Sequence, residues 1–222
     1  MIKVLCFDLD NTLIDRQYSA YRAYDAIIRH DSKNLLSEEE YVTYVNELLA
    51  HDQFGLISHR VNNEWYMSRF DFANQRTDEE WFQFWLSYSL QQVHLYPGTL
   101  ATLHYLKSKY QLGIITNGPS APQRGKLSKF PDLSIFGHIL VSGEWGTHKP
   151  DRSIFEEMLR LFDVSPAEMI YVGDNQDADI QGALNAGIRP VWLNGHHHVG
   201  RHHVTEITSI EELIKLEQGG LL

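Results

Sequence analysis

The stretch CFDLDNTLID, residues 6–15, decides how this chain is organised. It continues an apolar run that begins at Ile2 and stops abruptly at two acids, Asp8 and Asp10. A short run rich in Val, Ile and Leu, without polar alternation, is typical of a parallel strand buried on both faces. The sequence therefore predicts a buried first strand whose carboxyl end presents two carboxylates at one point.

Four further apolar runs have the same character as the first. The five predicted strands span residues 2–7, 112–116, 138–142, 169–172 and 190–193. Amphipathic helical patterns alternate with the later strands, at residues 99–109, 150–162 and 180–186. This alternation predicts an α/β fold built on a doubly wound parallel sheet.

The segment between the first and second predicted strands has a different pattern. It contains no convincing strand and about four amphipathic helical patterns. Two of these begin with the capping-box sequences SEEE at 37–40 and TDEE at 77–80. We therefore expect a helical insert over residues 16–95, and an α/β core made of residues 1–15 and 96–222.

Composition and charge exclude several classes of function. The chain has 19 basic and 29 acidic side chains, for a formal net charge of -10 at pH 7. Such a surface disfavours nucleic-acid binding, and no apolar stretch approaches the roughly 18 residues of a membrane span. The single cysteine, Cys6, excludes an intrachain disulfide and fits a reducing compartment. We expect a cytoplasmic protein, a monomer or homodimer, that binds neither nucleic acid nor membrane.

Polar side chains follow four of the predicted strands, where each strand ends. Ligands of open α/β sheets gather at the carboxyl ends of the strands, so these side chains are expected to meet. Each signal alone is weak, but four in order at strand ends indicate one site. The candidates are Asp8, Asp10, Thr12, Thr116, Asn117, Lys149, Asp174 and Asp179.

The chemistry of this set indicates a metal-assisted phosphoryl site. Carboxylates converging from the first and fourth strands would repel one another and raise one another's pKa values. A divalent cation removes that repulsion, and all-oxygen ligation suits Mg²⁺. Lys149 would balance the remaining charge, and the Thr116 hydroxyl can bind phosphoryl oxygens. The expected partner is therefore a small phosphorylated metabolite.

The four motifs resemble those of the haloacid dehalogenase (HAD) superfamily, in its phosphatase branch with a helical cap inserted after the first strand. The matching residues are DLDNT at 8–12, Thr116, the Lys149-Pro150 pair and GDNQDAD at 173–179. The stretches ITNG and HKPDRSIFEEML add to the resemblance. It implies a Rossmann-like core, a cap at residues 16–95, and a Mg²⁺-dependent phosphatase for a nucleotide or sugar phosphate.

The resemblance also implies a role for each acid. Asp8 would be the nucleophile that forms an aspartyl-phosphate, and Asp10 would be the general acid and then the general base. Mg²⁺ would be held by Asp8, by the backbone carbonyl of Asp10 and by Asp174, with Asp179 close by. Thr12 would help orient Asp10.

The remaining motif residues would serve the phosphoryl group. Thr116 and Asn117 would bind it, and Lys149 would stabilise its charge and restrain Asp8. Ala178 stands where family members often carry a polar residue, which leaves open whether Asp177 or Asp179 faces the metal. We favour Asp179, because DIQGALNAG then matches the usual helix. The histidine-rich run at 196–203 is interpreted as a solvated loop.

Three other functions compete with a phosphatase. A haloacid dehalogenase proper would not be expected to keep an acid at position 10, so Asp10 argues for phosphate chemistry. A phosphomutase shares the core and would retain the phosphoryl group on the enzyme. A phospho-acceptor signalling domain also uses Asp, Mg²⁺, Thr and Lys on a doubly wound sheet, but the helical insert and the second acid argue against it. Release of inorganic phosphate with turnover separates an enzyme from a signalling module.

Overall fold

The computed structural model describes the backbone of residues 1–222 and the side chains of residues 1–132 and 134–222. The chain forms two compact units, which are described separately. The α/β unit contains Met1–Ile14 and Leu95–Leu222, and the helical unit contains Asp15–His94. In the residues described, no helix is both long and apolar enough to cross a membrane.

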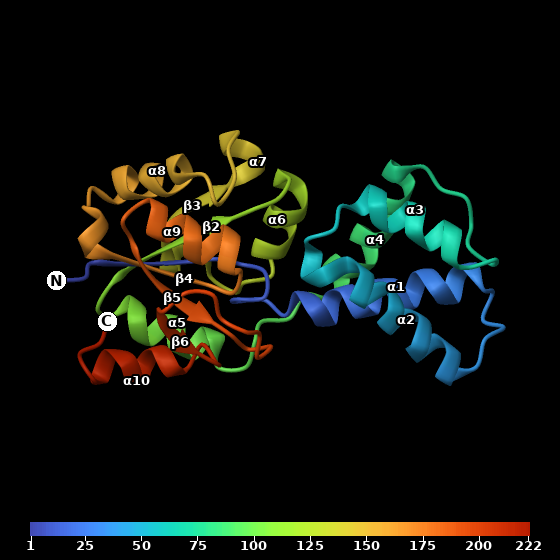
Figure 1. Ribbon diagram of the computed structural model, residues 1–222. Helices are drawn as coiled ribbons and strands as arrows, with labels where there is room; N and C mark the ends of the chain where they lie inside the picture. The colour runs from blue at the N-terminus through green and yellow to red at the C-terminus, as the bar shows by residue number, and fades with distance from the viewer. The chain divides into compact units, whose positions relative to one another are not determined.

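A six-stranded parallel sheet forms the centre of the α/β unit (Figure 1). Its order is β3-β2-β1-β4-β5-β6, so β1 lies between β2 and β4. The strands are β1 (Val4–Phe7), β2 (Gln111–Thr116), β3 (Phe136–Val141), β4 (Met169–Gly173), β5 (Arg189–Leu193) and β6 (Thr205–Ile207). The predicted doubly wound parallel sheet is confirmed, with β6 as an additional edge strand.

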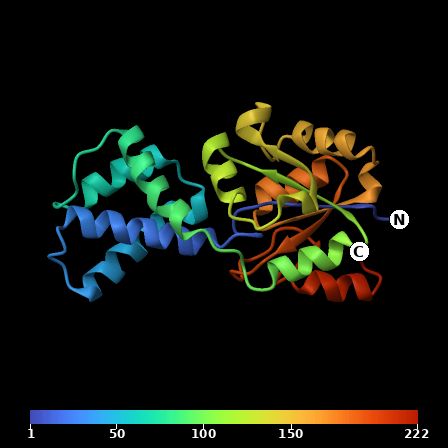
Figure 2. The same cartoon turned by 180° about the vertical axis from the view of Figure 1, so that it is seen from behind.

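Helices cover both faces of this sheet (Figures 1 and 2). On one side lie α8 (Arg152–Phe162) and α9 (Gly182–Asn185), and on the other lie α5 (Thr99–Lys107) and α10 (Glu212–Gln218). All four residues of β1 are fully buried beneath them, which explains the uninterrupted apolar run. The shorter elements are α6 (Ser120–Leu127), η3 (Leu133–Ile135), α7 (Ser142–Trp145), η4 (Pro166–Glu168) and the π-helical turn η5 (Gln176–Gln181).

One predicted helix start is wrong by two residues. The pattern placed Pro150 at the start of α8, whereas the helix begins at Arg152. The reason is a cap: the Asp151 carboxylate accepts a hydrogen bond from the Ser153 backbone N–H at 2.8 Å. Beyond the cap, Ile154, Phe155 and the rest of the predicted apolar stripe pack into the core under the sheet.

The helical unit consists of α1 (Arg16–Asp31), α2 (Glu38–Asp52), α3 (His59–Arg69) and α4 (Asp78–Ser89), with short 3₁₀ turns η1 (Gln53–Gly55) and η2 (Leu90–Gln92). Both capping boxes predicted from the sequence are present, at Ser37–Glu40 and Thr77–Glu80. An aromatic core that includes the fully buried Trp81 holds the helices together. The unit also buries an ion pair, in which Arg16 donates to Asp52 at 2.7 Å.

Candidate active site at the carboxyl ends of the strands

Lys149 lies at the centre of the charged groups at the carboxyl end of the sheet. Its Nζ donates to Asp8 Oδ1 at 2.5 Å, to Asp179 Oδ1 at 2.7 Å and to the Tyr171 hydroxyl at 2.8 Å. An ammonium group has three N–H donors, so these contacts account for all of them. Only 3% of Lys149 is exposed. A lysine buried this deeply requires anionic partners, and it restrains the Asp8 carboxylate.

Three carboxylates cluster at this end of the sheet, and two of them contact the lysine. Oxygen atoms of Asp8, Asp174 and Asp179 lie within 4.8 Å of one another. Asp177, the alternative left open by the sequence, is exposed and pairs with Arg201 at 2.8 Å instead. Three acids against one ammonium leave excess negative charge, and carboxylate oxygens are the ligands that Mg²⁺ prefers. The donor set of these three acids therefore fits a divalent cation.

The electrostatics of the site are those of crowded, buried acids. Burial raises the pKa of Asp8 to about 7, and Lys149 offsets only part of that effect. Burial, with the charges of Asp179 and Asp8, also raises the pKa of Asp174 well above its usual range. A divalent cation between these groups would favour their ionised forms.

The raised pKa of Asp8 predicts a pH-dependent effect of the substitution Asp8→Asn on stability. A carboxyl group whose pKa is higher in the folded protein than its ordinary value of 3.8 stabilises the fold below pH 3.8. This contribution is lost as the pH rises toward about 7. In EDTA, the free energy of unfolding of Asp8→Asn relative to wild type should therefore increase over this range, as measured by urea titration. A difference that stays constant with pH would contradict the prediction.

Local backbone geometry fixes the position of Asp179. The Asn175 backbone N–H donates to Asp179 Oδ2 at 2.9 Å, while the Asn175 side chain accepts from the backbone N–H groups of Asp177 and Ala178. Gly173 lies directly beneath the carboxyl group, where a Cβ atom would collide with the Asp179 side chain. Gly173 thus leaves room for the Asp179 side chain, and the Asn175 side chain caps the turn that carries it.

Asn117 positions Lys149 through its side chain. The Lys149 backbone N–H donates to Asn117 Oδ1, and Asn117 Nδ2 donates to the Lys149 carbonyl, each at 2.9 Å. The sequence predicted that Asn117 binds the phosphoryl group. In the structure its side-chain amide joins the loop after β2 to the backbone of Lys149, and phosphoryl binding by Asn117 stays a prediction. Thr116 is buried beside it, and its hydroxyl accepts a short hydrogen bond from Gln123.

Asp10 is held by helix α6. Its Oδ2 accepts from Lys126 Nζ at 2.5 Å and from Gln123 Nε2 at 3.1 Å. Thr12, expected to orient Asp10, donates to Asp8 Oδ2 at 3.5 Å. Neither Gln123 nor Lys126 belongs to the motifs that the sequence presents. Their spacing of three residues places them on one face of a helix. No helix was predicted over residues 120–127, so the sequence did not indicate this shared face.

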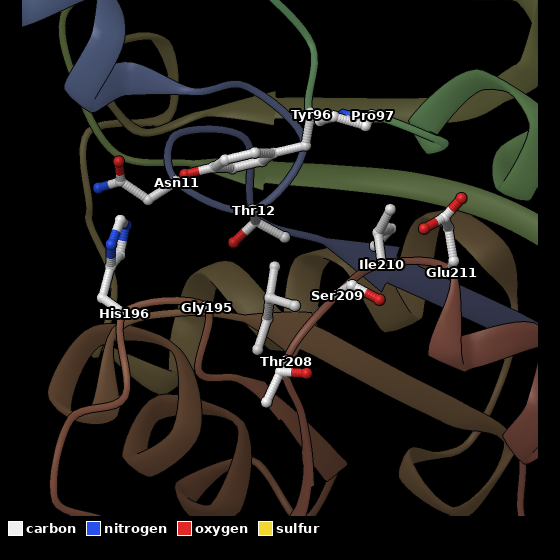
Figure 3. A pocket seen from close by; sticks show the side chains of 11 residues that line it. Asn11, Thr12, Tyr96, Pro97, Gly195, His196, Thr208, Ser209, Ile210 and Glu211 are labelled. Carbon is white, nitrogen blue, oxygen red and sulfur yellow. The ribbon is translucent and has the colours of Figure 1, made fainter.

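A separate cavity of about 220 Å³ borders the loop after β1 (Figure 3). Asn11 and Thr12 lie on one side of it, and Tyr96 and Ile210 are among the other residues that line it. Its lining includes none of the three converging acids. The acid cluster therefore lies outside the lining of this cavity, which shares only Thr12 with the predicted site residues.

The described side chains of the histidine-rich run do not form a group of metal-ligating residues like the acid cluster. Among the side chains that the structure describes, Asp8, Asp174 and Asp179 form the one group of three or more His, Cys, Asp or Glu residues able to hold a metal ion. His197 and His198 are exposed.

Comparisons with known proteins agree with this geometry. The family model described as haloacid dehalogenase-like hydrolase matches residues 5–193. The chain is 31% identical to the glyceraldehyde 3-phosphate phosphatase of Pyrococcus furiosus, over 98% of this chain and 95% of that protein. It is 31% identical to human N-acylneuraminate-9-phosphatase, over 87% and 83%. Among solved structures, the magnesium-bound HAD-hydrolase YfnB of Bacillus subtilis superposes with a TM-score of 0.79 at 23% identity, over 97% and 98%.

Proposed function

Because this chain belongs to the haloacid dehalogenase-like hydrolases and is a phosphoric monoester hydrolase, we propose that it cleaves a small sugar phosphate or nucleotide through an aspartyl-phosphate on Asp8, with Mg²⁺ as cofactor. The observation that carries this proposal is the cluster of Asp8, Asp174 and Asp179 carboxylates, two of which, Asp8 and Asp179, contact the buried Lys149. That arrangement supplies a restrained carboxylate nucleophile beside a set of oxygen ligands.

The proposed first step is attack by Asp8 on phosphorus. Lys149 holds Oδ1, so Oδ2 is the oxygen available for the new P–O bond. As that bond forms, the bond from phosphorus to the leaving oxygen breaks, and Asp10 gives its proton to that oxygen. In the second step Asp10 takes a proton from water, the water oxygen bonds to phosphorus, and Asp8 is released as a carboxylate.

The other residues of the site orient these groups. Mg²⁺, held by Asp8, Asp174, the Asp10 carbonyl and, directly or through water, Asp179, would neutralise charge on the phosphoryl oxygens. Lys149 would stabilise the same charge, and the Thr116 hydroxyl would bind a phosphoryl oxygen. Asn117 acts indirectly, by fixing the backbone of Lys149.

Metal removal tests the proposal. We expect the protein to release inorganic phosphate with repeated turnover from 4-nitrophenyl phosphate, and from at least one ester in a panel of sugar phosphates and nucleoside monophosphates. Dialysis against EDTA should abolish this activity, since the acid cluster would be left without its counter-charge, and added Mg²⁺ should restore it.

Several outcomes would contradict the proposal. Activity unchanged after exhaustive EDTA treatment would exclude the metal. Transfer of the phosphoryl group between positions of a sugar, without release, would indicate a phosphomutase. A single labelling event without turnover would indicate a phospho-acceptor module.

A further inference from the structure

Lys126 is buried against a catalytic acid that the sequence motifs do not connect with it. Only 7% of this residue is exposed, and its Nζ lies 2.5 Å from Asp10 Oδ2. Lysine is seldom buried, because removing its charge from water is costly unless an anion compensates it. The compensating anion here is the residue proposed as the general acid and base.

Gln123 extends this contact to the rest of the site. Its Nε2 donates to Asp10 Oδ2 at 3.1 Å, to the Asn117 carbonyl at 3.0 Å and, by a short bond, to the Thr116 hydroxyl. The residue is 2% exposed. One face of α6 therefore joins the loop after β1 to the loop after β2. Gln123 and Lys126, on this face, both donate to Oδ2 of Asp10.

We propose that Lys126 is a positioning residue for proton transfer, which holds the Asp10 carboxyl group and stabilises the negative charge that Asp10 gains when its proton passes to the leaving oxygen. This inference rests on the proposed function. In the first step Asp10 changes from acid to carboxylate while the leaving group departs as an alcohol. Two N–H donors on one oxygen of Asp10 stabilise its carboxylate form more than its protonated form. The hydrogen bonds from Lys126 and Gln123 therefore strengthen as negative charge develops on Asp10.

The test is how strongly the loss of kcat/KM in Lys126→Met depends on the leaving group of the ester. The ratio kcat/KM reports the steps up to departure of the leaving group. An alkyl phosphate needs protonation of its leaving oxygen, whereas 4-nitrophenol leaves readily as an anion. General acid catalysis contributes typically 10²–10⁴-fold, and a positioning residue should supply part of it. We expect kcat/KM to fall roughly 10- to 100-fold for the alkyl ester and less than about 5-fold for the aryl ester.

Two further variants separate positioning from a general structural effect. In an Asp10→Asn background, Lys126→Met should cause little additional loss, because Lys126 acts through Asp10. Lys126→Arg should recover part of the alkyl-ester activity. Lys129→Met, at an exposed lysine just beyond α6, is the matched control and should resemble wild type on both esters. If Lys126→Met does not fold, Lys126→Gln provides the same comparison.

The outcomes are distinguishable from failure of the proposed function. If wild type releases no phosphate from any ester, the proposed function fails. If wild type is active, the inference is overturned by an unchanged rate in Lys126→Met, by an equal loss on both esters, or by a loss that persists in the Asp10→Asn background. The last two would indicate that Lys126 contacts the phosphoryl group directly.

Discussion

Asp8→Asn should lower turnover of every phosphate ester by roughly 10⁴-fold or more, because an amide cannot attack phosphorus and the aspartyl-phosphate cannot form. The substitution keeps the size and shape of the side chain. The amide oxygen can still accept the hydrogen bond from Lys149 that Asp8 accepts at 2.5 Å. The measurement is kcat/KM for 4-nitrophenyl phosphate, together with the mass of acid-quenched protein, which should show a phosphoryl adduct only in wild type.

The loss in Asp8→Asn should not come from unfolding. Burial raises the pKa of Asp8, so an ionised carboxylate is unfavourable at this position, and a neutral amide removes one of three mutually repelling acids. We expect the variant to be at least as stable as wild type at pH 8 in EDTA. Asp177→Asn is the matched control, since it makes the same change at an exposed acid. Near-wild-type turnover in Asp8→Asn would exclude Asp8 as the nucleophile.

The sequence predicted those parts of the fold that depend on local patterns. The buried run ending at Phe7 and the capping box at Ser37 are local, and each appears as expected. Strand β6 has three residues, of which only Ile207 is buried, so its pattern was too short to separate from a loop. The start of α8 was misplaced because Asp151 caps that helix, so the helix begins at Arg152 rather than at Pro150.

The site was less predictable where a residue acts through a tertiary contact. Lys126 and Asp10 are 116 positions apart in the chain, and nothing near Lys126 in sequence marks it as buried. The choice between Asp177 and Asp179 depended on a π-helical turn, which directs only Asp179 toward Lys149. From the sequence, the side-chain amide of Asn117 was equally compatible with binding a ligand and with binding the backbone. Only the tertiary position of Lys149 shows its contact with that residue's carbonyl.

Lys149→Met should destabilise the metal-free protein and nearly abolish turnover. Lys149 is the ammonium group shared by Asp8 and Asp179, and removing one partner of a buried ion pair typically costs about 3–5 kcal/mol. Turnover should fall by at least roughly 10²-fold, since the charge on the phosphoryl group and the position of Asp8 both depend on this residue. The measurements are the free energy of unfolding in EDTA and kcat/KM in Mg²⁺.

Magnesium should distinguish this electrostatic role from simple packing. Without Lys149, the cluster of Asp8, Asp174 and Asp179 has no ammonium among its contacts, so a divalent cation gains more attraction there than in wild type. Saturating Mg²⁺ should therefore raise the free energy of unfolding of Lys149→Met by more than it raises that of wild type. Lys129→Met, at an exposed lysine, should respond to Mg²⁺ as wild type does. If Mg²⁺ stabilised wild type and Lys149→Met equally, the lysine would be filling space rather than balancing the acids, and the metal site would have to lie elsewhere.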